Sequence, residues 1–67
     1  MTVARVTEIS ATSTEGFDDA AKQGIARASK TLRGITSAWV KDQNLMIDNG
    51  KVVGFKVNLA VTFILDD

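Results

Sequence analysis

The chain has a single tryptophan, Trp39, and the next two alternate positions carry Lys41 and Gln43. In an extended segment these three side chains share one face, because a strand turns alternate residues the same way. An indole can stack on a planar ligand, which contributes on the order of 1 kcal/mol beyond simple burial. Lysine donates hydrogen bonds, and glutamine both donates and accepts them. These residues could bind a flat polar ring; the alternative is that Trp39 anchors a protein–protein contact, where tryptophan is common.

Histidine and cysteine are both absent from the 67 residues. Their absence excludes disulfides, thiolate chemistry and cysteine-rich zinc sites, and removes the commonest general base and metal ligand. Catalysis would then need a carboxylate, lysine or hydroxyl in a shaped pocket. We therefore expect no catalytic residues, no metal site within one chain, and a protein that is not an enzyme. Glu8, an acid inside an apolar strand, is expected to pair with a neighbouring charge.

The charges balance, with eight basic and eight acidic residues and no charge run longer than two. A nucleic-acid-binding protein normally shows a basic patch or stripe, so no nucleic-acid partner is expected. No apolar stretch approaches the 18 residues that a membrane span requires. The first residues contain no apolar signal core, so we expect the protein to remain in the cytoplasm.

The pattern of apolar residues predicts one domain over residues 1–67. β-branched residues predict a first strand over 2–10, and three- and four-residue apolar spacing predicts a helix over 16–34. Thr12 with Glu15 fits a capping box, Ser13 is an alternative N-cap, and Gly34 is the predicted helix end. Strands over 36–47 and 51–65 complete a β-α-β-β order. The predicted fold is α+β, with a three-stranded antiparallel sheet and one helix on one face.

Asn49-Gly50 is the preferred pair for a two-residue type I′ hairpin. That turn predicts a register for the last two strands, unless a bulge intervenes. The predicted pairs are Asp48–Lys51, Gln43–Lys56, Val40–Leu59, Trp39–Ala60, Ala38–Val61 and Ser37–Thr62.

The last strand is long for so short a chain. At about 3.3 Å per residue it spans roughly 45–50 Å, whereas a compact chain of this length is about 22–28 Å across. Either the strand bends, or its ends lie against other chains. One short helix also covers only one sheet face, and small domains without disulfides commonly oligomerise. The sequence therefore favours an assembly.

The whole chain resembles the dodecins, which are small β-α-β-β proteins that assemble as hollow, spherical dodecamers. The segments that carry the resemblance precede the helix, form it, and lie along the last strand: Ala11-Thr12-Ser13, residues 17–28 and residues 55–63. The resemblance implies a homododecamer that stores and quenches a flavin, such as riboflavin or FMN, without turning it over. It implies two flavin rings stacked between symmetry-related tryptophans, with a glutamine of the last strand bound to the ring edge.

Two positions depart from that family pattern. Ser37 stands where the family tryptophan normally falls, and Trp39 lies about 6.6 Å further along the same face. Lys56 stands where the glutamine falls, and lysine only donates hydrogen bonds. The candidate ligand-binding residues are Ser37, Trp39, Gln43 and Lys56. We expect a dodecameric protein that binds or sequesters a small planar ligand, with weak or no flavin binding.

Two alternatives remain open, and the ligand itself is left open with them. One is a flavin-storage protein that stacks the ring on Trp39. The other is a calcium-binding or purely structural assembly, because the chain looks closer to the flavin-free branch of the family, part of which binds calcium. Calcium needs six to eight oxygens, and acidic residues of this chain could supply them only across chains: Glu15, Asp18, Asp19, Asp66 and Asp67.

Overall fold

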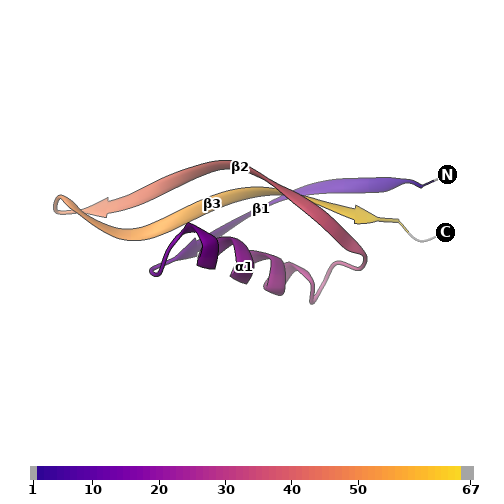
Figure 1. The fold of residues 1–67 in the computed structure, drawn as a ribbon, viewed down its shortest axis with the longest axis horizontal. Helices are drawn as coiled ribbons and strands as arrows, with labels where there is room; N and C mark the ends of the chain where they lie inside the picture. The colour runs from indigo at the N-terminus through magenta and orange to yellow at the C-terminus, as the bar shows by residue number, and fades with distance from the viewer. Residues whose placement is uncertain (1, 66–67) are drawn as a thin grey trace.

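The computed structural model describes residues 2–65 and contains four elements in the predicted order (Figure 1). Their bounds are Ala4–Ser13 for β1, Phe17–Ala28 for α1, Ile35–Asp48 for β2 and Lys51–Ile64 for β3. The strands form one antiparallel sheet in the order β1-β3-β2, so the last strand is the central one. The predicted α+β fold, with a single helix on one face of three strands, is confirmed.

The core lies between α1 and the middle of β3. Alternate β3 residues Val57, Leu59 and Val61 are at most 1% exposed, and Ala20 of α1 is fully buried against them. Burying each of the three larger side chains contributes about 1.5–3 kcal/mol. Phe17 closes one end of this core with its ring edge-on to Phe55, at a centroid distance of 5.2 Å.

The helix packs on β1 and β3 at very short range. A Cβ placed on Gly24 would lie 2.9 Å from the Cβ of Ala11, which is closer than two carbons normally approach. Gly24 therefore lets the helix backbone approach the sheet. The small residues along the helix stripe predict this close packing, and the structure confirms it.

The ends of the helix differ from the sequence-based prediction. The capping box of Thr12 and Glu15 is wrong, because both Thr12 and Ser13 pair with β3 as the last residues of β1. The Ser13 hydroxyl instead accepts a hydrogen bond from the backbone N–H of Glu15 and donates one to Asp19. Gly16 is the N-cap, without a side-chain bond.

The helix also stops at Ala28, six residues before the predicted end at Gly34. The hydroxyls of Ser29 and Thr31 donate to the carbonyls of Ile25 and Ala28, at 2.8 and 3.3 Å, and so compete with the helical hydrogen bonds. Gly34, at φ 70°, instead leads into β2, and its carbonyl accepts from the backbone N–H of Ile64 at 3.0 Å.

The hairpin turn is as predicted, but the register beyond it is not uniform. Asn49 and Gly50 have φ of 53° and 77°, which fits a type I′ turn, and Asp48 pairs with Lys51. Val53 of β3 and Lys41 of β2 are extra residues at two bulges, and their shifts cancel.

Beyond the second bulge the predicted pairs are correct, Trp39–Ala60 and Val40–Leu59 among them. Between the bulges the predicted pair Gln43–Lys56 is wrong. Gln43 pairs with Val57, and Asn44 pairs with Lys56.

The molecule is long and thin, with principal extents of 51, 19 and 13 Å. The β2–β3 hairpin extends past the ends of β1 and α1 (Figure 1). Apolar side chains near its tip are 40–63% exposed: Leu45, Met46, Ile47, Val52 and Val53. The expectation that the last strand outruns a compact globule is confirmed.

We expect Gly24→Ala to lower the thermal unfolding midpoint. Alanine favours a helix over glycine by about 1 kcal/mol, but overpacking typically costs about 1–3 kcal/mol, and the new methyl meets the stiff Ala11. The matched control is Gly16→Ala, where a Cβ meets nothing within 4 Å. A double-mutant cycle with Ala11→Gly should recover stability; an unchanged midpoint for Gly24→Ala would show that the contact is not tight.

Candidate functional site

Within residues 2–65, no other element covers the face of the sheet turned away from α1 (Figure 1). Because directly paired residues of an antiparallel sheet share a face, the register arranges this open face in rows of three, from β1 through β3 to β2. The rows are Val6–Thr62–Ser37, Glu8–Ala60–Trp39, Ser10–Asn58–Asp42 and Thr12–Lys56–Asn44. We call these twelve residues the open face.

Three of the four predicted ligand-binding residues lie on the open face. They are Ser37, Trp39 and Lys56, and Trp39 is 66% exposed. The fourth, Gln43, does not belong with them, since its partner Val57 is buried under α1. The physical reason is the bulge at Lys41, which moves the residues that follow it by one position and so reverses their faces.

The predicted residues are also spread along the face. On β3, Lys56 is four residues from Ala60, the partner of Trp39, and this corresponds to about 13 Å at 3.3 Å per residue. The distance from Lys56 to the row of Ser37 is about 20 Å by the same measure. A site that joins Trp39 to Lys56 therefore needs a second protomer or a long ligand.

The bulge at Lys41 places two successive β2 side chains on the open face. The ammonium of Lys41 donates to Glu8 Oε1 in an ion pair, and Asp42 Oδ1 accepts a hydrogen bond from the amide of Asn58. The predicted pairing of Glu8 with a neighbouring charge is confirmed. The Glu8 hydrogen bond, followed by the negative charge of that carboxylate, raises the pKa of Lys41.

These polar residues surround a shallow depression beside the row of Trp39. It measures about 350 Å³ and is lined by Glu8, Ile9, Ser10, Lys41, Asp42 and Asn58. Sequence reasoning missed Asp42 and Asn44 because the bulge is invisible in the alternation of β2. Ser10 and Thr12 could have been found, because they continue the alternation of Glu8 along β1.

One polar atom of the open face lacks a partner. The Thr62 hydroxyl is buried and makes no hydrogen bond within residues 2–65. Leaving a buried polar group unpaired costs about 1–3 kcal/mol. Thr62 shares its row with Ser37, so a donor brought to this row by another molecule would recover that cost.

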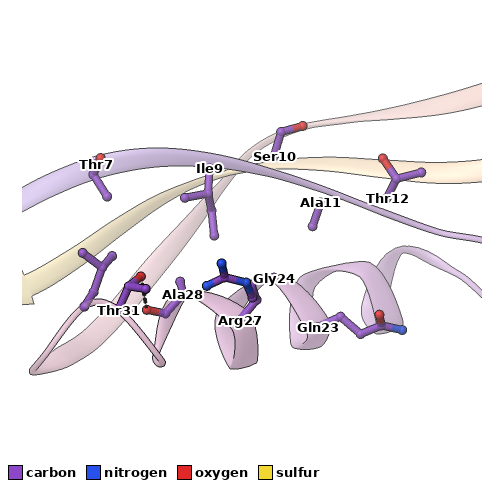
Figure 2. Close-up of a pocket in the computed structure, with 11 residues that line it drawn as sticks. Thr7, Ile9, Ser10, Ala11, Thr12, Gln23, Gly24, Arg27, Ala28 and Thr31 are labelled. Carbon is purple, nitrogen blue, oxygen red and sulfur yellow. Dashed lines mark hydrogen bonds between the residues drawn. The ribbon is translucent and has the colours of Figure 1, made fainter.

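Another cavity, of about 580 Å³, lies between β1 and α1, and Figure 2 shows the residues around it. Ile9 and Ala11 extend from β1 toward α1, and Arg27 extends from α1 toward β1. None of the predicted ligand-binding residues lines this cavity.

The acidic residues at the start of α1 do not form a metal site in one chain. Asp19 accepts hydrogen bonds from Ser13 and Gln23. No group of three metal-ligating side chains comes together within the described part of the chain. Asp66 and Asp67, the other acidic candidates, lie outside the described residues.

A three-stranded sheet with one helix on one face and an indole on the other defines a small α+β domain with an exposed sheet surface. The sequence profile of the Dodecin family matches residues 3–66, and the chain belongs to the dodecin family. The resemblance drawn from the sequence is therefore confirmed. Among residues 2–65 no helix is long and apolar enough to cross a membrane.

Solved dodecin structures superpose closely on this chain. The dodecin of Streptomyces davaonensis is 36% identical with a TM-score of 0.94, covering 98% of this chain and 97% of its own. The dodecin of Streptomyces coelicolor is 35% identical with a TM-score of 0.93, covering 98% and 94%. A point mutant of the T. thermophilus dodecin is 34% identical with a TM-score of 0.93, and all of both chains is covered. The comparison with curated proteins finds no match.

We expect Glu8→Gln to lower the pKa of Lys41 toward its ordinary value of 10.5. A raised lysine pKa means that the pair stabilises the fold at neutral pH and stops doing so as the pH rises through the raised value. NMR titration of the lysine side-chain resonances measures the change, with Asp18→Asn as control. A Lys41 titration curve identical in wild type and Glu8→Gln would disprove the ion pair in solution.

Proposed function

We propose that the protein is a non-catalytic homododecamer that binds or sequesters a small planar ligand on its open face, with Trp39 as the stacking surface. The observation that carries this proposal is the position of Trp39, an indole 66% exposed on the sheet face opposite the core. A large aromatic side chain left in water on a flat face is typical of a ligand platform or an interface.

The shape of the chain supports assembly. The molecule is 51 Å long, but its core fills only the part beneath α1. The apolar side chains at the hairpin tip are largely exposed among the residues that the structure describes. Contact with other copies would bury those side chains and supply a partner for the Thr62 hydroxyl. Membership of the dodecin family supports twelve copies arranged as a hollow shell.

The open face also supports an altered flavin site. Ser37, at the family's tryptophan position, offers a hydroxyl in place of a ring, and Lys56 offers a cation in place of an amide. We therefore propose weak or no flavin binding at the usual place. Flavin stacked on Trp39 is the second candidate, since Trp39 lies on the same face as Ser37 and one row away. Calcium binding and a cytoplasmic location stay predictions.

Native mass spectrometry should show a complex of twelve chains. Trp39 is the only tryptophan and tyrosine is absent, so protein fluorescence reports on Trp39 alone. We expect planar heteroaromatic compounds to quench it at micromolar to sub-millimolar concentrations, whereas an aliphatic sugar alcohol, as control, leaves it unchanged. A monomer would refute the assembly, and the absence of quenching by every planar compound tested would refute the ligand platform.

A double change tests whether Ser37 and Lys56 weaken flavin binding. We expect Ser37→Trp with Lys56→Gln to bind riboflavin at least tenfold more tightly than wild type, a gain of about 1.4 kcal/mol, because it restores a stacking ring and a group that both donates and accepts. Quenching of riboflavin fluorescence measures this. Lys51→Gln in the hairpin turn is the matched control; equal riboflavin affinities in wild type and the double variant would show that these positions do not set flavin binding.

A further inference from the structure

The stacking surface and a polar pair lie in adjacent rows of one protomer. Trp39 pairs with Ala60, and Asp42 pairs with Asn58, two residues away on β3. Two residues of a strand span about 6.6 Å, so a ring stacked on Trp39 and extending along the strands brings its edge to Asp42 and Asn58. Lys56 and Ser37 are not needed for this arrangement.

The row of Trp39 is low at its centre. Its central residue, Ala60, has the smallest side chain among the β3 residues of the open face and is 7% exposed, so a ring in this row would lie over Ala60 and against the exposed indole. The depression of about 350 Å³ that contains Asp42, Asn58 and Ser10 begins beside that row. A bound ring would therefore contact the indole of Trp39 at one end and the polar depression at the other.

The polar depression is rich in acceptors. The Asn58 amide donates to Asp42 Oδ1, and this leaves the second carboxylate oxygen of Asp42 and the carbonyl oxygen of Asn58 as acceptors. The nearest cation, Lys41, donates to Glu8 in an ion pair that joins β2 to β1 across β3, and both residues line the same depression as Asp42. The hydrogen bond of the ammonium therefore goes to Glu8, and the Asp42 carboxylate, although its charge also acts on Lys41, keeps acceptor capacity for a ligand.

We propose that Trp39, Asp42 and Asn58 form a binding site, contained in one protomer, for a planar ring whose edge carries two adjacent N–H donors. The 2-amino-4-oxopyrimidine ring of pterins and of guanine has such an edge. Its two donors match the two acceptors left free, the second carboxylate oxygen of Asp42 and the carbonyl oxygen of Asn58, and the bond to Asp42 is charge-assisted. This inference rests on the proposed function, and it names the ligand class of the same face.

The same geometry disfavours an isoalloxazine ring. The polar edge of a flavin presents one N–H between two carbonyl oxygens. Placed against Asp42, those carbonyls face a negative charge and accept nothing from it, while only one donor is used. The site therefore distinguishes two flat rings of similar stacking strength by the pattern of donors and acceptors at the edge.

Two ring compounds without sugar chains test the inference on the assembled protein. We expect pterin to quench Trp39 fluorescence with an affinity at least tenfold higher than that of lumiflavin, with calorimetry as a second measurement. This comparison uses the wild-type protein and needs no variant. A lumiflavin affinity equal to or higher than that of pterin would overturn the inference and leave a planar-ligand platform in place.

A charge-removing variant locates the discrimination. Asp42→Asn keeps the size of the side chain, and we expect it to reduce pterin affinity at least tenfold while leaving lumiflavin affinity unchanged or raised. Asp48→Asn in the hairpin turn is the matched control, and native mass spectrometry checks that both variants assemble. Equal pterin affinities in Asp42→Asn and Asp48→Asn would overturn the role of Asp42. A fully assembled protein that is quenched by neither ring would overturn the proposed function, and this inference with it.

Discussion

The alternation of β3 is the constraint on which the rest of the structure depends. As the central strand, β3 pairs with both β1 and β2. The face on which a β3 side chain lies is therefore also the face of its paired residues on β1 and β2. Val57, Leu59 and Val61 fix the helix side, because they form the core with α1. Asn58 and Ala60 then necessarily lie on the opposite face, and with them the indole, the ion pair and the depression. Burial on one side of a strand thus determines which chemistry is exposed on the other.

The element order, the sheet, the helix position and the turn could be predicted because each depends on local patterns. Seven alternate apolar residues, an Asn-Gly pair and a run of small residues at helical spacing are sufficient for that. The helix end at Ala28 could not be predicted, because it depends on the hydroxyls of Ser29 and Thr31, which also donate to the carbonyls of Ile25 and Ala28, and apolar spacing does not reveal such bonds. The bulge at Lys41 was missed because a strand pattern contains no sign of an extra residue. That single residue decides whether Gln43 or its neighbours reach the candidate site.

The open face combines an aromatic surface with charged and polar side chains that are bonded in pairs. Glu8 forms an ion pair with Lys41, whereas Asp42 accepts a hydrogen bond from the neutral Asn58 amide and keeps its negative charge. Such a face can pack against a second copy only if a donor or a cation lies opposite Asp42, because burying an isolated charge is costly. It can also present directional donors and acceptors to a small molecule. The same side chains can therefore take part both in assembly and in ligand binding.

The two cancelling bulges have a consequence for reading related sequences. An extra residue in β2 at Lys41 is balanced by an extra residue in β3 at Val53, so the pairs from Val40–Leu59 to Ser37–Thr62 return to the register set by the turn, until a further shift between Ser37 and Ile35. A relative that lacked both residues would keep the same core and the same indole position, yet its hairpin would be one residue shorter on each side. Aligned column by column without gaps, the residues between the two bulges would be matched to positions on the wrong face. Inferences about ligand contacts in that stretch should therefore follow strand pairing rather than residue order.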